Sequence, residues 1–274
     1  MTHSGRTTIR HRPRASAGPR RREAPSRQRD RPADGASFGR AGRTSIAAIV
    51  AACLLVPTHA RAGELSGSVS LASQLVDRGL AISSATPALQ GAVAWTTPSG
   101  WSLGVAGGVE LRSPGHLAEG VARVARTWSL SESWRVQADV VYYHYAGRLQ
   151  ANVYEPGIYW LYRDILTFGL SGVYIASADE HRLHPAADLN FHWPLAGAFA
   201  LAGGLGVSRY AVPYGYPPNE RYHTGYYRYG TAGLLWSHGA WQVELDRVVV
   251  DPGSRRYLRG MVASPWLATI SGAF

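Results

Sequence analysis

Six charged side chains and one tyrosine of this chain could interact with a solute or with one another. They alternate with apolar or small residues, and the set comprises Glu110, Glu119, Arg123, Arg135, Asp139, Glu155 and Tyr159. In an extended strand, alternate side chains share one face, and opposite charges on neighbouring strands can pair. Acids that oppose arginines across a narrow passage create a transverse field that orients small polar solutes. Mutual pairing that fills an interior is the alternative, and the sequence leaves both open.

Signals for catalysis or for metal binding are weak. Ser237 and His238 are adjacent and Glu244 is the nearest acid. Neighbours in a strand face opposite sides, so no catalytic residues and no enzyme are predicted. One further stretch carries metal-ligating side chains at a spacing that matches no closed site, namely Asp179, Glu180, His181 and His184. We expect a solvated loop there, with no metal and no cofactor.

The elements that must position the charged set are β-strands. Between Trp101 and Leu111, apolar side chains alternate with small or polar ones, a period of two that is typical of a strand with two different faces. Similar runs lie at roughly 65–75, 88–97, 117–130, 134–145, 153–162, 165–176, 186–193, 198–209, 224–236, 241–248 and 260–274. The strands number about twelve, with ten as the lower alternative, and their lengths suit a tilted crossing of a bilayer.

Eight of the nine tryptophans flank five very short polar connections between these runs. They are Trp95, Trp101, Trp128, Trp134, Trp160, Trp193, Trp236 and Trp241. Because indole combines an apolar body with a single N–H donor, it settles where hydrocarbon meets water. Recurrence beside every second connection therefore marks one face of a membrane, and we interpret these residues as a periplasmic aromatic girdle.

The other connections are longer and more polar. They lie near residues 78–87, 112–116, 146–152, 177–185, 210–223 and 249–259. Thirteen of the fifteen tyrosines, all but Tyr159 and Tyr162, lie toward this side and supply an opposite girdle. Short turns at one end and long loops at the other are typical of an antiparallel up-and-down barrel in the outer membrane. Phe274 ends the last run as an aromatic assembly signal would, whereas a secreted sandwich or lipocalin-like barrel, the soluble alternative, would not sort Trp and Tyr to opposite ends.

Two positions are ambiguous on the sequence alone. Alternation places Arg126 on the same face as Trp128, so it either reaches toward the interface beside that ring or is turned inward by a bulge. The run from Ala198 to Ser208 places only small residues on its inner face. These residues either leave open space or accommodate bulky side chains from a neighbouring strand.

The excess positive charge lies entirely before the strands. Residues 1–62 hold thirteen Arg and three acidic residues, whereas the remaining 212 residues hold fifteen of each. We therefore expect no nucleic-acid partner. The pattern predicts a disordered extension over residues 1–45, the apolar and cleavage regions of a signal peptide over residues 46–62, and a barrel over residues 63–274. A lipoprotein site at Cys53 is the weaker alternative.

Residues of the first three runs resemble a known family. Arg78-Gly79, Ser83, Pro87-Ala88, Gln90-Gly91, Gly100 and Gly104 resemble the signature of the TorF-type porin family of proteobacterial outer-membrane proteins. The resemblance implies an outer-membrane barrel with porin activity and supplies no catalytic residues. Val76-Asp77 replace the aromatic residue that usually precedes Arg-Gly in that signature.

The sequence as a whole predicts a channel for the passive diffusion of small hydrophilic solutes across the outer membrane. Its expected partners are outer-membrane lipid, lipopolysaccharide, the barrel assembly machinery and those solutes. A non-conducting barrel that serves envelope structure or adhesion is the first alternative. A barrel enzyme that modifies lipid is the second.

Overall fold

The computed structural model describes residues 63–112, 116–146, 151–176, 182–214, 221–258 and 260–274. Nearly all of the described chain is β-structure. Twelve long strands form the wall, namely β1 (Glu64–Ala72), β4 (Ala88–Thr96), β5 (Trp101–Glu110), β6 (Leu117–Ser129), β7 (Trp134–Tyr145), β8 (Ala151–Tyr162), β9 (Leu166–Ile175), β10 (His184–Pro194), β11 (Phe199–Tyr214), β12 (Arg221–His238), β13 (Trp241–Val250) and β14 (Trp266–Ala273). The expected signal peptide and extension lie outside the described residues.

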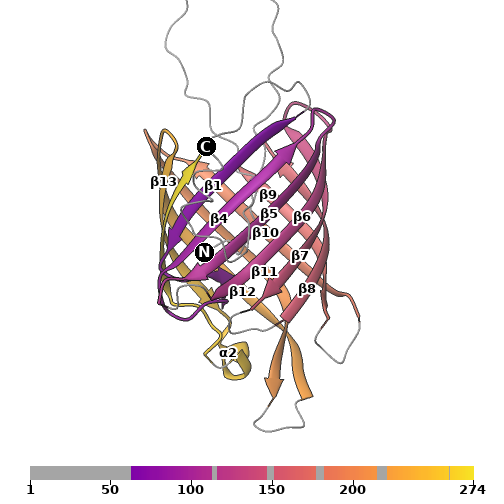
Figure 1. Cartoon of the computed structure of the whole chain (residues 1–274), viewed down its shortest axis with the longest axis vertical. Coiled ribbons are helices and arrows are strands. Elements are labelled where there is room, and N and C mark those ends of the chain that lie inside the picture. Colours follow the sequence, from indigo (N-terminus) through magenta and orange to yellow (C-terminus); the bar gives the residue numbers. More distant parts are fainter. Residues whose placement is uncertain (1–62, 113–115, 147–150, 177–181, 215–220, 259) are drawn as a thin grey trace, which may run out of the picture.

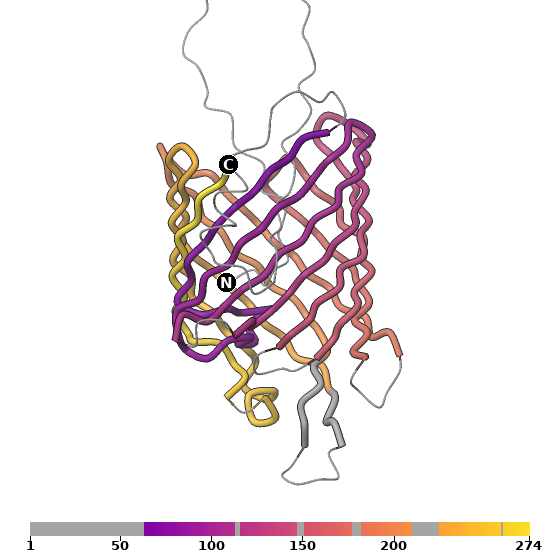
Figure 2. The backbone as a smooth tube through the Cα atoms, viewed as in Figure 1, coloured from indigo at the N-terminus to yellow at the C-terminus, as the bar shows by residue number. Residues whose placement is uncertain are grey.

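The twelve long strands close into one antiparallel barrel. Each pairs with its neighbour along the chain, and β1 pairs with both β4 and β14. The predicted up-and-down barrel of twelve strands is confirmed. Figure 1 shows the short connections at its upper end and the longer ones, with helix α2 (Pro252–Leu258), at its lower end. The strands tilt strongly across the wall (Figure 2), as closure of a barrel requires.

The two faces of the wall differ in polarity as the alternation predicts. The outward side chains of Leu103, Val105 and Leu170 are between 43% and 49% exposed, whereas the inward Ala94 and Val121 are almost fully buried. A continuous apolar exterior is stable against lipid and not against water. Of the helices in the described part of the chain, none has the length and hydrophobicity of a membrane span.

The chain terminus completes the closure. The N–H of Phe274 donates to the carbonyl of Gly67 at 3.0 Å, and the N–H of Gly67 donates back at 2.9 Å. The ring of Phe274 lies against Gly67, where a Cβ atom would meet it. The last residue therefore contributes both ladder bonds and a packed ring to the seam.

The first long connection differs from its prediction as an outer polar loop. Residues 73–87 fold into the barrel and form a small hairpin of β2 (Val76–Asp77) and β3 (Leu80–Ala81). Leu75, Ala81 and Ile82 are completely buried. Removing these apolar side chains from water is favourable. The lumen provides that burial, whereas a polar loop outside the barrel rim would leave them exposed to water.

The last long connection also contributes to the interior. We expected a strand from residue 260, but β14 begins at Trp266, after Pro265. Residues 260–265 instead extend the inner hairpin, since the N–H of Ala81 donates to Met261 at 2.6 Å and that of Ala263 donates to Gly79 at 2.9 Å. Helix α2, which the sequence did not predict, precedes this segment.

Candidate functional site: the lumen and its first loop

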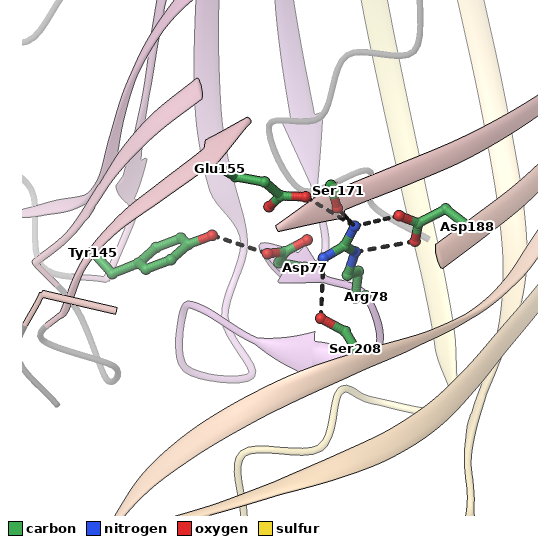
Figure 3. Close-up of polar contacts among 7 residues, drawn as sticks. All are labelled: Asp77, Arg78, Tyr145, Glu155, Ser171, Asp188 and Ser208. Atoms are coloured by element: carbon green, nitrogen blue, oxygen red, sulfur yellow. Dashed lines mark hydrogen bonds and ion pairs between the residues drawn. The ribbon is translucent and has the colours of Figure 1, made fainter. Parts of the chain in front are cut away.

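The inner hairpin is held by Arg78, which lies at its tip. Arg78 and Gly79 both have positive φ, 47° and 80°, a conformation that glycine adopts freely and arginine rarely does. The turn carries the guanidinium across the lumen to the far wall, where it donates hydrogen bonds to residues of four consecutive strands (Figure 3). The partners are Asp188 at 3.0 Å, Ser208 at 3.0 Å, Glu155 at 3.1 Å and Ser171 at 3.3 Å.

This ion cluster is buried. The side chains of Arg78 and Glu155 are 4% and 1% exposed, and that of Asp188 is 9% exposed. Removing one partner of a buried ion pair leaves an uncompensated charge, at a cost of about 3–5 kcal/mol. The cluster therefore fixes the position of the loop relative to the wall.

Apolar contacts hold the loop against both sides of the barrel. On one side, Leu75 and Ile82 pack in a cluster with Val121 and Tyr143. On the other side, Leu80 packs with Tyr227, Val250 and Leu258, and Val76 packs with Val248, Ala263 and Leu267. The loop thus crosses the lumen at the end that carries the longer connections.

Hydrogen bonds fix the flanks of the loop as well. Tyr145 donates its hydroxyl to Asp77 at 2.9 Å, and the N–H of Ser84 donates to Glu110 at 2.8 Å. The side-chain oxygen of Gln74 accepts from the N–H of Ser264 at 2.8 Å. The loop is therefore tied to β5, to β7 and to the segment before β14.

The seven charged or phenolic residues selected from the sequence divide into three groups. Glu110 and Glu155 contact the inner loop. Glu119, completely buried, accepts from Gln90 at 2.8 Å, while Arg123 pairs with Asp139 farther along the wall. Their side chains lie on the inner face, and their place along a solute path stays a prediction.

The remaining two of the seven are Arg135 and Tyr159. Arg135 pairs with Asp164 at the rim that carries the short turns. The ring of Tyr159 lies flat over Gly157 and Gly169, whose missing side chains leave room for it.

The sequence did not identify the centre of the site. Arg78 belongs only to the family resemblance, and the predicted set of pore-lining residues does not include Ser171, Asp188 or Ser208. A signal is present, because Leu80, Ala81 and Ile82 form an apolar run within the predicted polar loop 78–87, and Leu75 and Val76 lie just before it. Such a run indicates burial.

Small residues of β11 accommodate their neighbours. Asn190 of β10 lies over Gly204, and Tyr229 of β12 lies over Gly206. The second of the two alternatives, accommodation of bulky side chains, therefore describes these two positions.

In the part of the wall that the structure describes, acids outnumber arginines on the inner face. Among the described residues, the buried or half-buried carboxylates of the inner wall and its loop are Asp77, Glu110, Glu119, Asp139, Glu155, Asp188, Glu244 and Asp246. The corresponding arginines are Arg78, Arg123 and Arg135. A lumen with this composition has a net negative field.

The eight selected tryptophans all lie on the outer face near the short turns. Trp160 stacks on Phe168 with ring centroids 5.7 Å apart, and Trp134 contacts Tyr162 at 4.9 Å. Arg126 points outward between two of them, with its guanidinium carbon 5.2 Å from the ring of Trp101 and 5.1 Å from that of Trp128. The strand irregularity of β6 lies beside Gly108 and Val109 of β5, so no bulge turns Arg126 inward.

The groups considered for catalysis, which lie in the described part of the chain, do not converge. His238 stacks on Trp236 at 5.9 Å, whereas Glu244 is buried on the inner face. In the described part of the chain, no three His, Cys, Asp or Glu side chains are grouped to hold a metal ion. Asp179, Glu180 and His181 lie outside the described residues.

Comparisons with known proteins add little. No family model matches this chain, so the TorF-type resemblance stays a prediction, and no curated protein matches it. Among solved structures it is similar to one described as "KdgM porin", with 9% identity, a TM-score of 0.46 and coverage of 76% of this chain and 98% of that chain. It is also similar to "NanC porin structure in rhombohedral crystal form", with 11% identity, a TM-score of 0.47 and coverage of 77% and 98%. At these identities and TM-scores, the similarity does not indicate the function of this chain.

Proposed function

We propose that this protein is an outer-membrane channel through which small hydrophilic solutes diffuse passively. The observation that carries the proposal is the contrast between the two faces of one closed wall. The outer face exposes large apolar side chains, and the inner face carries carboxylates, arginines, hydroxyls and amides. A polar lumen behind a lipid-facing wall is what a water-filled passage requires.

The inner loop limits what can pass. Residues 73–87 cross the lumen and contact both walls, so a solute must move past the loop or displace it. Loops that fold into a barrel reduce its bore. The proposed cargo is therefore small, and the proposal places the constriction of the path at the Arg78 cluster.

Single-channel recording tests this proposal. The full-length protein, purified in its folded form, is reconstituted into planar lipid bilayers, and we expect discrete conductance steps. A preparation unfolded by heat serves as the control for detergent artefacts. Folded protein that inserts into the bilayer and produces no steps above the control would exclude the channel.

A non-conducting structural barrel is the second candidate, because the buried loop is a specific observation in its favour. The two candidates differ in the passage of uncharged solutes. Liposomes that contain the protein should swell in sugars below a size limit if the lumen conducts, and should swell in none if the loop closes it.

A further inference from the structure

The residues that hold Arg78 belong to the wall of the barrel and not to the loop. Each comes from a different strand, and these strands, β8 to β11, pair in sequence along one side of the lumen. Figure 3 shows the four acceptors around the guanidinium, namely Glu155, Ser171, Asp188 and Ser208. We call this set of acceptors the wall site. Its backbone is fixed by the ladder of the barrel.

The acceptors of the wall site match the donors of a guanidinium. Nε of Arg78 donates to Oδ1 of Asp188 at 3.0 Å, and Nη2 donates to Oδ2 of the same carboxylate. Nη1 donates to Ser208 at 3.0 Å, and Nη2 also donates to Glu155 at 3.1 Å and to Ser171 at 3.3 Å. Two parallel bonds to one carboxylate require a planar fork, which an ammonium group lacks. The wall site therefore suits a guanidinium in shape as well as in charge.

The wall site carries more acidic groups than its occupant neutralises. Two carboxylates, those of Glu155 and Asp188, pair with the one guanidinium of Arg78, in a lumen whose described acids outnumber its described arginines. Ser171 is only half-buried, so the site has an edge at accessible surface. The field of the lumen attracts a cation toward that edge.

An aromatic ring borders the wall site. The half-buried Tyr159 lies with its ring over Gly157 and Gly169. Gly157 is the strand partner of Ser171, and Gly169 is the strand partner of Asp188. A guanidinium stacks favourably on such a ring. A solute with this group therefore meets a stacking surface beside the acceptors.

The occupant of the wall site is held under backbone strain. Arg78 has a φ of 47°, a conformation that is unfavourable for a residue with a side chain. A guanidinium carried by a free solute could donate to the same acceptors without that strain. Its binding would separate Arg78 from the far wall, so occupancy of the site and the position of the inner loop are coupled.

We propose that the wall site binds solutes that carry a guanidinium group, and that Arg78 occupies the site in their absence. A bound solute takes over the acceptors and releases Arg78, so the inner loop loosens as the solute binds. Binding at the wall site is independent of conduction, whereas the role of these solutes as preferred cargo rests on the proposed function.

Isothermal titration calorimetry of the folded full-length protein in detergent tests the proposal, with methylguanidinium and methylammonium as probes. The variant Arg78→Gly removes the occupant, and glycine tolerates the positive φ. This variant should bind methylguanidinium at least about tenfold more tightly than methylammonium, since one lost charge-assisted hydrogen bond corresponds to about that factor. The wild type should bind methylguanidinium more weakly than the variant, because the tethered Arg78 competes for the site.

A second substitution identifies the site. Adding Asp188→Asn to Arg78→Gly should remove the preference for methylguanidinium. The matched control adds Asp164→Asn instead, which removes a carboxylate at the rim that carries the short turns and should leave binding unchanged. Equal binding of the two probes by Arg78→Gly, or a preference that survives Asp188→Asn, would overturn the proposal.

Hydrogen exchange of the wild type provides the test if Arg78→Gly does not fold. Methylguanidinium should accelerate exchange over residues 76–82 several-fold once its concentration exceeds the millimolar effective concentration that is typical of a tethered group. Methylammonium at the same concentration should not, and unchanged exchange with methylguanidinium would overturn the proposal.

Single-channel recording separates this proposal from the proposed function. Binding of methylguanidinium by a protein that conducts no ions would support the wall site and exclude the channel. In a conducting protein, reversal potentials should show that methylguanidinium is more permeant than methylammonium. The opposite order would exclude guanidinium solutes as the preferred cargo.

Discussion

At the scale of single residues, the structure depends on one arginine that belongs to no strand of the barrel. Arg78 joins an inner hairpin to β8, β9, β10 and β11 through Glu155, Ser171, Asp188 and Ser208. The guanidinium suits this role because its planar fork can serve several acceptors at once. A lysine would keep the charge and lose most of these bonds.

We predict that Arg78→Ala releases the inner loop. Two buried carboxylates would then lack their common partner, which destabilises the folded barrel by about 3–5 kcal/mol. Single-channel conductance should rise or become noisy, and Arg78→Lys should give an intermediate result. Arg112→Ala, an exposed position beyond β5, is the control, and an unchanged trace for Arg78→Ala would show that the loop does not obstruct the path.

At the scale of elements, the seam between β1 and β14 depends on a glycine. Gly67 allows the ring of Phe274 to lie against the backbone of β1, while the two residues exchange backbone hydrogen bonds. The seam joins the first and last strands of the barrel, so its contacts have the greatest separation along the chain and form at the greatest entropic cost.

We predict that Gly67→Val impairs closure of the barrel. A branched side chain would displace the Phe274 ring, and overpacking of this kind typically costs about 1–3 kcal/mol. The fraction of protein that migrates as the compact folded species without heating, on a denaturing gel, measures the effect. Gly91→Val is the matched control, since Gly91 has no atom within 4 Å of an added Cβ; equal folding of the two variants would contradict the prediction.

The stability of helix α2 depends on its N-cap residue, Asp251, whose carboxylate titrates. Partial burial by itself would raise the pKa of Asp251, but hydrogen bonds from the N–H groups of Arg228 and Ser254, with the charge of Arg228, lower it below its ordinary value of 3.8. A depressed pKa means that the cap stabilises the helix above pH 3.8, and that this contribution is lost as the pH falls through the lower folded value.

We predict that Asp251→Ala loosens α2 without unfolding the barrel. Loss of an Asp cap costs about 1 kcal/mol of helix stability. Hydrogen exchange over residues 254–258 should accelerate at neutral pH, and the difference from the wild type should shrink below pH 3.8. Glu132→Ala, in an exposed turn, should leave this exchange unchanged, and a pH-independent difference would show that the carboxylate charge is not the cause.

At the scale of the whole molecule, the balance of charge inside the barrel decides which solutes are favoured. The described lumen carries eight buried or half-buried carboxylates and three arginines. In a narrow passage with a low-dielectric wall, such an excess attracts cations and repels anions. Charge selectivity is therefore a property of the entire inner face.

We predict that the channel prefers potassium to chloride. Reversal potentials in a KCl gradient should have the sign of cation selectivity, and Arg123→Ala should strengthen it because the inner face would lose a positive charge while the carboxylate of Asp139, with which Arg123 pairs, remains. Arg126→Gln on the outer face should change nothing. Chloride selectivity of the wild type would contradict the prediction while leaving conduction itself established.

The sequence by itself determined the wall of this protein. Period-two alternation and the placement of Trp beside the short turns predicted twelve strands, and most of their bounds agree with the structure to within about two residues, because each strand must present one face to lipid and one to the interior. These constraints act on each strand locally, so they are visible in the alternation of residues along the sequence. The prediction was weakest where a segment leaves the wall, at residues 73–87 and 260–265.

Only the tertiary structure decided what occupies the lumen. Arg78 meets Asp188 and Ser208 across 110 and 130 positions of sequence, and residues 260–265 pair with a hairpin from the other end of the chain. Such contacts depend on which strands face one another across the closed barrel, and no periodicity encodes that. Alternation specifies which side chains point inward, whereas closure specifies which of them meet.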